Sequence, residues 1–592
     1  MGRKTKKEVG AVVKSRGVSF RVWAPFANAV GLSGTFNEWG ETPMESEGDG
    51  YWFVELREAA VGQEYKYIIH NGDKVIKKND PRSLTITTLA GNSVIVETSF
   101  DWQDDKHVYW PREKQIIYEL HIGTFNRLDP ATSGTFESAI QKLDYLHDLG
   151  VNTIELMPIG NMMVEREWWG YTPEYIYSVE NLYGGRYQLL EFIKAAHQKG
   201  IMVILDVVYN HFATDQELNM WQFDGWSEND KGGIYFYNDY RSSTPWGDTR
   251  PDYGRPEVRQ FILDNVRMWL WDCHIDGLRV DSTIYIRNLA GQNDDPANDI
   301  ADGWYLLQRI NTVAKKINPQ SFVVAEDIGI NDYLLKPVRE GGAAFDAQWE
   351  VNFPEGIRAA LRSSEPEDIH LDTLIDQLKR RFDGDPLRRV VYIDSHDSAA
   401  NGSGRFSELI APKRSGGLFA REQSVIAAAI IMTTPGIPMI LNGQEFMQGG
   451  SFNDWQGLDW NKVEKHAGIV EAYKHLIALR QNSYGLSAGL TGPNIDIFHV
   501  DQVNKVLVYR RWLNGGPGDD VVVMINFSNI AVDNYEFYVP ANGIWRVRFN
   551  STWNGYSEDF KNIIVNDIPA NNNKASLNLP ASCALILSQD AV

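Results

Sequence analysis

The sequence predicts an α/β protein in which a central (β/α)8 barrel is flanked by a β-sandwich at each end. Apolar strands alternate with helical stretches from Gln115 to about Asn482, which is the pattern of β/α units on a parallel sheet. Eight candidate strands can be placed in this region. Short strands with alternating polar and apolar residues precede and follow it, separated by turn residues.

The N-terminal region is predicted to be a small sandwich. Residues 1–10 form a basic tail that we expect to be flexible, and residues 11–105 form the sandwich. Its alternating runs at 18–23, 52–56 and 65–69 are separated by Asn-Gly, Asp-Gly and Pro. We interpret Trp23 and Trp39 in this region as core or interdomain packing residues.

Residues 106–482 are the predicted barrel. Thr135 is expected to cap a helix that begins at Phe136 and ends at Gly150. Further helices are expected at 188–197, from Pro256 toward Trp269, and at 420–432. The candidate strands lie at 118–123, 151–157, 203–206, 277–281, 322–325, 344–346, 391–393 and 437–441. The long segment 212–253 follows the third strand, and a segment of this length is more often a functional loop than a linker.

Residues 483–592 are the predicted C-terminal sandwich. Alternating runs return at 506–509, 521–525 and 535–539, and helical periodicity stops. The sequence shows no internal repeat and no low-complexity tract.

Composition limits the class of partner. The formal net charge of −21 disfavours nucleic acid and anionic membranes as partners, and a neutral ligand fits better. The only cysteines, Cys273 and Cys583, are too few for a disulfide framework and suit a reducing compartment. We see no secretory signal and no apolar run long enough to span a bilayer, so we expect a cytoplasmic protein.

Candidate functional residues gather at the ends of four predicted strands. In a parallel barrel the C-terminal ends of all strands meet at one face, where the active site lies. The four segments contain carboxylates and imidazoles and lie at 206–211 (Asp-Val-Val-Tyr-Asn-His), 276–281 (Asp-Gly-Leu-Arg-Val-Asp), 324–327 (Val-Ala-Glu-Asp) and 394–397 (Asp-Ser-His-Asp). This pattern is typical of an acid/base site.

Asp281 and Glu326 are the predicted catalytic pair, because cleavage of an acetal between sugars needs a proton donor and a second carboxylate. Arg279 lies on the same face of its strand as Asp281 and is expected to hold Asp281 ionised as a nucleophile. Glu326 follows the apolar residues 322–325, where desolvation is expected to raise its pKa and keep it protonated as the general acid.

The remaining site residues are assigned to binding. Asp397 is placed on the seventh strand, where it binds sugar hydroxyls that move as the transition state forms. His211 and His396 are expected to be neutral hydrogen-bond donors, and Asp206, Asn210 and His211 are expected to order one another. A metal site is disfavoured because no His-x-His or His-Glu-x-x-His spacing occurs. The Gly-x-Ser-x-Gly match at 485–489 lacks the preceding apolar strand that a nucleophile elbow needs.

In order and spacing, the four segments resemble the signature regions of the α-amylase family of retaining glycoside hydrolases and transglycosylases. The resemblance extends to Trp169-Gly170-Tyr171, to 443–446 (Gly-Gln-Glu-Phe) and to both flanking β domains. It implies that Asp281 is the nucleophile, Glu326 the acid/base and Asp397 the transition-state stabiliser. It further implies that the sugar is held by Tyr171, Asp206, His211, Arg279 and His396.

The resemblance leaves the acceptor open. The module with 34–39 (Gly-Thr-Phe-Asn-Glu-Trp) and the segment 443–446 are similar to those of glycogen branching enzymes, which usually have Glu where Ser398 stands. The segments 244–247 and 345–349 resemble maltooligosyltrehalose trehalohydrolases. A 1,4-α-glucan branching enzyme is therefore the first hypothesis, and a trehalohydrolase, an α-amylase-type hydrolase and an inactive glucan-binding protein are the alternatives.

The expected partner is an α-glucan polysaccharide or a maltooligosaccharide. We expect no metal or other cofactor, although Asn210 is a residue that could serve a calcium ion in this family. A monomer is the favoured oligomeric state.

Overall fold

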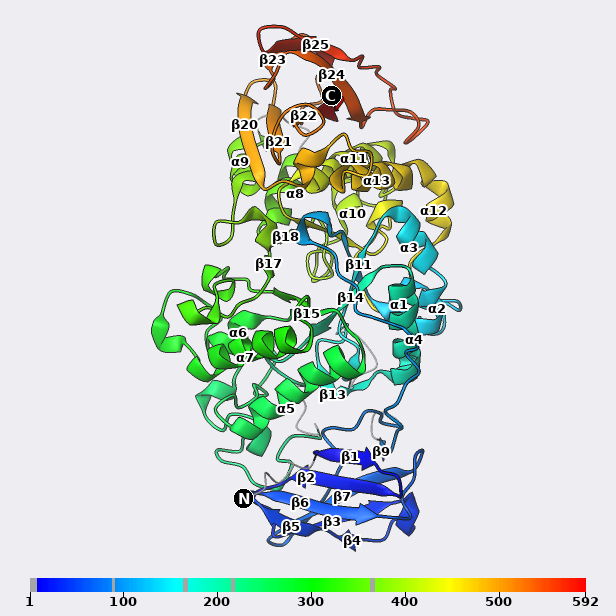
Figure 1. Cartoon of the computed structure of the whole chain (residues 1–592), viewed down its shortest axis with the longest axis vertical. Coiled ribbons are helices and arrows are strands. Elements are labelled where there is room, and N and C mark those ends of the chain that lie inside the picture. Colours follow the sequence, from blue (N-terminus) through cyan, green and yellow to red (C-terminus); the bar gives the residue numbers. More distant parts are fainter. Residues whose placement is uncertain (1–7, 88–90, 163–168, 214–218, 363–367, 592) are drawn as a thin grey trace.

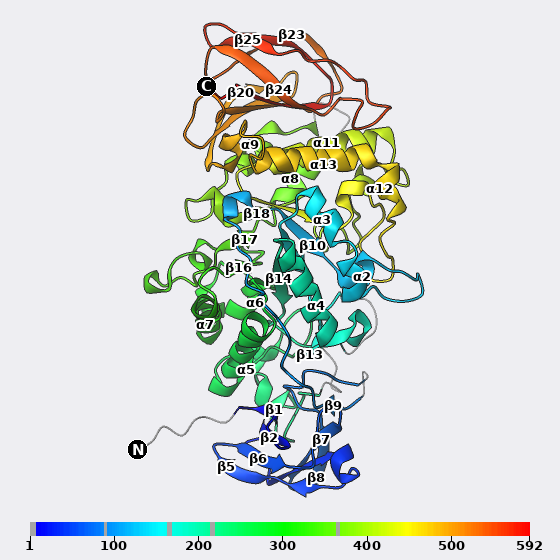
Figure 2. The ribbon, with the colours of Figure 1, turned by 45° about the vertical axis from the view of Figure 1, so that its right-hand side comes forward.

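The computed structural model describes residues 8–87, 91–162, 169–213, 219–362 and 368–591. The molecule is elongated, and three bodies follow one another along its long axis (Figure 1). The blue N-terminal strands lie at one end, the barrel lies in the middle and the red C-terminal strands lie at the other end. Figure 2 shows the same order from a second direction.

The N-terminal body is a sandwich of two antiparallel sheets with orders β1-β2-β6-β5 and β4-β3-β7-β8, and β9 pairs with β7. Its core contains Val22, Leu32 and Tyr67, which point inward from facing strands. The strands are β1 Gly10–Val13, β2 Val18–Trp23, β3 Ala29–Gly34, β4 Thr42–Pro43, β5 Glu45–Gly48, β6 Tyr51–Leu56, β7 Glu64–Asn71, β8 Lys74–Lys78 and β9 Ser93–Val94.

The central body is a closed parallel barrel, which confirms the predicted fold class. Its strands follow the chain order β10-β11-β14-β15-β16-β17-β18-β19, and β19 pairs with β10 to close the ring. They are β10 Ile117–Leu120, β11 Thr153–Leu156, β14 Met202–Val207, β15 Gly277–Val280, β16 Phe322–Ala325, β17 Ala347–Trp349, β18 Arg389–Val391 and β19 Ile437–Leu441.

The helices lie around the barrel. They are α1 Ile122–Phe125, α2 Phe136–Ile140, α3 Leu143–Leu149, α4 Gly185–Gln198, α5 Pro256–Arg267, α6 Thr283–Arg287, α7 Ala301–Ile317, α8 Phe353–Arg362, α9 Leu371–Lys379, α10 Phe406–Ile410, α11 Leu418–Thr433, α12 Asn461–Lys465 and α13 Ala467–Arg480. Thr135 caps α2 as predicted, because its side chain accepts the Ser138 N–H. The single helix expected there is two helices, and Lys142 at the break places its ammonium 4.1 Å from the ring centre of Trp460.

Three barrel strands differ from the prediction. The first, β10, ends at Leu120, and residues 122–123 of the expected 118–123 belong to α1. The sixth strand, β17, begins after the expected 344–346, because Ala344 has a φ of 64° and Asp346 turns its carboxylate to Lys315 and to the Val323 N–H. A left-handed residue does not continue a strand. The seventh strand, β18, ends at Val391, so Asp397 lies in the following loop and not on the strand.

Segment 212–253 joins the barrel to the N-terminal sandwich. Asp224 accepts the Phe26 N–H at 2.9 Å, and the rings of Phe26 and Trp226 stack with centres 4.4 Å apart. Trp23 is buried and packs edge-on against Tyr235. The packing interpretation is therefore confirmed for Trp23, whereas Trp39 is 41% exposed and contradicts it. A small sheet, β12 Gly160–Met162 with β13 Pro173–Val179, was not predicted.

The C-terminal body has a six-stranded sheet of order β20-β21-β22-β27-β24-β25 and a second sheet of β23 and β26. The strands are β20 Asn494–Asp501, β21 Val506–Trp512, β22 Val521–Asn526, β23 Val532–Tyr538, β24 Gly543–Asn550, β25 Ile568–Ala570, β26 Lys574–Leu579 and β27 Cys583–Ser588. Arg511 on β21 is fully buried against the barrel and donates to the carbonyls of Thr433 and Leu490.

These strand positions support the domain limits 11–105, 106–482 and 483–592, which we propose for the chain. Cys273 and Cys583 are both buried and free. Within the described ranges, no helix combines the length and the apolar character that crossing a membrane requires.

Candidate active site

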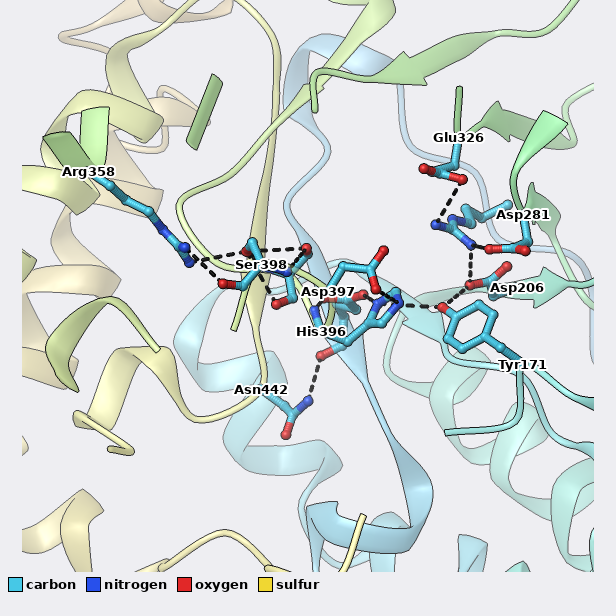
Figure 3. Close-up of polar contacts among 12 residues, drawn as sticks. Tyr171, Asp206, Asp281, Glu326, Arg358, His396, Asp397, Ser398 and Asn442 are labelled. Carbon is cyan, nitrogen blue, oxygen red and sulfur yellow. Dashed lines mark hydrogen bonds and ion pairs between the residues drawn. The ribbon is translucent and has the colours of Figure 1, made fainter. Parts of the chain in front are cut away.

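The predicted site residues meet at the C-terminal ends of the barrel strands (Figure 3). Asp206 lies near the end of β14, Asp281 follows β15 directly, and Glu326 follows β16 directly. Parallel pairing sets Asp206 beside Arg279 in the register of β14 and β15. The topology therefore brings together carboxylates that lie far apart in the sequence.

Arg279 links three of these carboxylates. Its Nη1 donates to Asp281 Oδ1 at 2.6 Å and to Asp206 Oδ2 at 2.7 Å, and its Nη2 lies 3.7 Å from Glu326 Oε2. The guanidinium is fully buried, and although burial acts to lower its pKa, the carboxylates raise it well above its usual value. Arg279 is thus a fixed positive charge at the centre of the site, as predicted.

Asp281 is held as a hydrogen-bond acceptor. In addition to Arg279, the amide nitrogen of Asn210 donates to Asp281 Oδ2 at 2.7 Å and to the Asp281 carbonyl at 3.0 Å. Two donors on the carboxylate, one of them charged, fix its orientation. An ionised and oriented carboxylate has the chemistry of a nucleophile.

Glu326 has the opposite environment. It is buried, and burial raises its pKa to about 8, with nearby Asp281 and Asp397 adding to the effect and Arg279 opposing it. The Ser282 N–H donates to Glu326 Oε2 at 2.7 Å and fixes the orientation of the group. Near neutral pH Glu326 is therefore mostly protonated and can act as a proton donor.

Tyr171 and His396 form one wall of the site. Their rings stack with centres 4.7 Å apart, and the Tyr171 hydroxyl donates to Asp206 Oδ2 at 2.5 Å. Burial would lower the pKa of His396, but Asp397 and Glu119 raise it to about 9. The expectation of a neutral His396 is therefore wrong, because the ring carries a charge near neutral pH.

Glu119 on β10 is a site residue that the sequence reasoning missed. Its Oε1 lies 2.6 Å from His396 Nδ1, and its Oε2 accepts the His396 N–H at 3.0 Å. The available signal was an acidic residue inside the otherwise apolar strand Ile117–Leu120. Buried acids in apolar strands are uncommon unless they are paired.

His211 lies beside Asn210 in the site, and its role as a hydrogen-bond donor to the sugar stays a prediction. Asn210 uses its amide nitrogen on Asp281, so its oxygen accepts from His211 Nδ1. Burial lowers the pKa of His211 to about 4, which leaves the ring neutral with Nε2 unprotonated. Nε2 is buried and has no hydrogen-bond partner among the described residues. The ring stacks on Trp246 from the long loop, with centres 4.5 Å apart.

The expected mutual ordering of Asp206, Asn210 and His211 is only partly found. Asn210 and His211 contact each other, but Asp206 binds Tyr171 and Arg279 instead. Burial raises the pKa of Asp206 to about 7. Because both ends of the Asn210 amide are engaged, Asn210 is not free to bind calcium, and the prediction of a metal-free site stays a prediction.

Asp397 borders an open cavity beside Glu326. Its side chain is 57% exposed and lies 3.5 Å from His396 Nε2. The cavity has a volume of about 530 Å³, and its lining includes Glu326, Trp349, Arg358, Asp397 and Ser398. Glu326 and Asp397 thus face a space that can admit a sugar.

The Gly-x-Ser-x-Gly segment at 485–489 has a structural role. Ser487 is fully buried, and its hydroxyl donates to the Leu479 carbonyl at 2.7 Å. It is therefore not available as a nucleophile.

Comparison with known proteins gives consistent matches over the chain. The family model described as "Alpha amylase, catalytic domain" matches residues 120–229 and 218–481. "Carbohydrate-binding module 48 (Isoamylase N-terminal domain)" matches residues 8–83, and "Alpha amylase, C-terminal all-beta domain" matches residues 498–590.

Individual relatives point to two activities. The chain is 33% identical over 464 residues to a malto-oligosyltrehalose trehalohydrolase from Saccharolobus solfataricus, covering 74% of each chain. It is 30% identical over 567 residues to a 1,4-alpha-glucan branching enzyme from Oceanobacillus iheyensis, covering 90% of this chain and 86% of that one. A pullulanase structure from Bacillus acidopullulyticus shares the fold, with a TM-score of 0.78 at 18% identity over 99% of this chain and 75% of that one.

Proposed function

The chain belongs to the α-amylase family, and on this basis we propose that it cleaves α-1,4-glucosidic bonds by a double displacement with net retention. One observation carries the proposal: two of the carboxyl groups around Arg279, those of Asp281 and Glu326, differ in environment. Asp281 accepts two hydrogen bonds as a carboxylate, whereas burial keeps Glu326 protonated. This is the division of roles that a retaining mechanism needs.

In the first step an Asp281 oxygen attacks the anomeric carbon, the glycosidic C–O bond breaks, and the Glu326 proton passes to the leaving oxygen. In the second step the Glu326 carboxylate takes the proton of the acceptor hydroxyl, whose oxygen displaces Asp281. Asp397 binds ring hydroxyls as positive charge develops. Tyr171, Asp206, His211, Arg279 and His396 hold the sugar.

The proposed acceptor is the 6-hydroxyl of a glucan, which makes the chain a 1,4-α-glucan branching enzyme. The support is the breadth of similarity to branching enzymes, which extends over 90% or more of this chain in several of them. The experiment is incubation of purified enzyme with amylose while iodine absorbance and reducing ends are followed together. Loss of colour without matching reducing ends, with new α-1,6 linkages by NMR, supports branching. Reducing ends that rise in step with colour loss would refute it.

Trehalose release is the second candidate, favoured by the 33% identity to a trehalohydrolase. Trp246, in the segment 244–247 that resembles those enzymes, stacks on His211 in the site. The test is release of free trehalose from a trehalosyl-capped maltooligosaccharide, and its absence would remove this candidate. An α-amylase-type hydrolase is the outcome in which reducing ends appear from amylose and no trehalose is released. An inactive glucan-binding protein predicts no product at all.

The matched carbohydrate-binding module supports an α-glucan or maltooligosaccharide as the partner. The cytoplasmic location and the monomeric state stay predictions.

A further inference from the structure

Arg358 on α8 is bound to the segment that carries His396 and Asp397. Its Nε donates to the Ile393 carbonyl at 2.9 Å, and its Nη1 donates to the Ser398 carbonyl at 2.9 Å. Its Nη2 donates to Ser398 Oγ at 3.1 Å and forms an ion pair with Asp394. Figure 3 shows this guanidinium reaching toward Ser398 from the side opposite Tyr171. One side chain therefore fixes both ends of the segment 393–398.

Ser398 makes this attachment compact. Its Oγ accepts the Ser395 N–H at 2.8 Å, and its own N–H donates to Ser395 Oγ at 3.2 Å. The two serines close a tight turn around His396 and Asp397. Branching enzymes usually have Glu at this position. In this chain the position is Ser398, whose small hydroxyl accepts a hydrogen bond from Arg358.

Asp397 depends on this turn for its position. Its exposed carboxylate lies 3.5 Å from His396 Nε2, a longer distance than a hydrogen bond of ordinary strength. His396 is in turn held by Glu119 on the far side of the ring. The backbone of the turn, anchored by Arg358, is therefore what sets where the Asp397 carboxylate stands relative to Glu326 and the cavity.

We propose that Arg358 is a positioning residue that holds Asp397 in its working geometry through the turn formed by residues 393–398. This inference rests on the role given to Asp397 in the proposed function. The planar guanidinium supplies parallel donors to two carbonyls and a carboxylate, which a single ammonium cannot do. Because small displacements of a reacting group lower the rate strongly, loss of this anchor is expected to reduce turnover.

A double-mutant cycle with Arg358→Gln and Asp397→Asn tests the inference. Rates are measured on a maltooligosaccharide and on α-maltosyl fluoride, whose leaving group needs no protonation. Arg358→Gln is expected to lower kcat by roughly 10–100-fold on both substrates, with KM changed less than about 2-fold. In the Asp397→Asn background, Arg358→Gln should lower kcat by less than a further factor of about 2, because the effects of coupled residues are not additive.

Three outcomes would overturn the inference. One is an equal loss in both backgrounds, which means that Arg358 acts independently of Asp397. Another is a raised KM with unchanged kcat, which means that Arg358 binds the leaving glucan from its place in the cavity wall. The third is unchanged rates for folded Arg358→Gln. If instead Asp397→Asn alone leaves turnover unchanged, the proposed function fails at Asp397, and the two failures are thus distinguishable.

The controls separate positioning from folding. Arg388→Gln removes an arginine that directly precedes β18, at the end of that strand opposite to the segment 393–398. Arg388 pairs with Asp383 at 3.0 Å and donates to the Phe345 carbonyl, and its substitution should leave kcat unchanged. If Arg358→Gln does not fold, Ser398→Ala removes one of the Arg358 hydrogen bonds together with the one that Ser398 Oγ accepts from the Ser395 N–H. It is expected to lower kcat about 2–5-fold, with the same non-additivity toward Asp397→Asn. Arg358→Lys should recover part of the lost rate, and additivity in the Ser398→Ala cycle would also overturn the inference.

Discussion

Asp281 and Glu326 show how environment separates two similar side chains. Both lie at the same guanidinium, but the contact is 2.6 Å for Asp281 and 3.7 Å for Glu326. The Asn210 amide adds a second donor to Asp281, whereas the desolvation of Glu326 is only partly offset by Arg279 and by the Ser282 N–H. Burial and hydrogen-bond donors together therefore distinguish the residue that attacks from the one that donates a proton.

Removal of either group should abolish most activity without unfolding the protein. Asp281→Asn is expected to lower turnover by several orders of magnitude because the nucleophile is lost. Glu326→Gln is expected to cost roughly 10²–10⁴-fold on natural glucans, but much less in the first step with α-maltosyl fluoride, because fluoride leaves without a proton. Steady-state rates and circular dichroism of both variants check this, and full activity in either one would disprove the assignment.

The pKa of Glu326 sets the alkaline limit of activity. The active form is the protonated one, so kcat/KM on a maltooligosaccharide should fall as pH rises through about 8. This alkaline decrease in kcat/KM should be missing in Glu326→Gln, because the glutamine has no proton to lose in this pH range. A pH–rate profile in which wild type and Glu326→Gln share the same alkaline limb would assign it to another group.

At the scale of elements, strand ends were predictable and loop positions were not. Asp206, Asp281 and Glu326 were located correctly because an apolar run that stops at a carboxylate is a local signal. Asp397 was placed on a strand although it lies in a loop, because the chain after β18 is shaped by Arg358 and Glu119, both remote in sequence. The charge of His396 also depends on a remote partner, Glu119, which no local pattern contains.

The base of the barrel contains a buried charged cluster that joins the linker after the N-terminal sandwich to α4 and β15. His197 lies 3.0 Å from Asp105 and 2.9 Å from Asp276, and Asp276 also accepts the Val203 N–H at 2.8 Å. Burial acts to lower the pKa of His197, but the two aspartates raise it to about 9. Burial acts to raise the pKa of Asp105, but His197 and His274 lower it to about 2.

This cluster should make stability depend on pH. The contribution of His197 is complete below about 6.5, its unfolded pKa, and is lost as pH rises through about 9. The contribution of Asp105 is complete above about 3.8 and is lost as pH falls through about 2. His197→Gln should therefore lower the free energy of unfolding by roughly 3 kcal/mol near pH 6, since it removes the charge between two buried carboxylates, which keep only their contacts to His274 and His107. Denaturant unfolding of wild type and His197→Gln at pH 6 and pH 9.5 checks this. An equal loss of unfolding free energy at both pH values would show that the charge on His197 does not contribute to stability.

At the scale of the whole molecule, segment 212–253 connects the N-terminal sandwich with the active site. At one end Asp224 and Trp226 contact the sandwich at Phe26, and at the other end Trp246 stacks on His211. A glucan bound by the sandwich would therefore be held by a body that is packed directly onto a loop of the site. Binding of a glucan by the sandwich would raise the local concentration of a polymer substrate at the site.

Trp39 is the residue of the sandwich best placed to bind a glucan. It lies in a turn where Glu38 and Trp39 both have positive φ, and such conformations recur at binding sites. The exposed ring borders a cavity of about 510 Å³ together with Lys66, Lys77 and Asn92. Trp39→Ala should weaken retardation in amylopectin-containing gels by roughly 3–10-fold, equivalent to about 1 kcal/mol. Turnover of maltohexaose should not change, because the ring lies outside the catalytic site. Trp553→Ala, which removes an exposed tryptophan of the C-terminal body, is the matched control, and equal retardation of the two variants would refute a role for Trp39 in polymer binding.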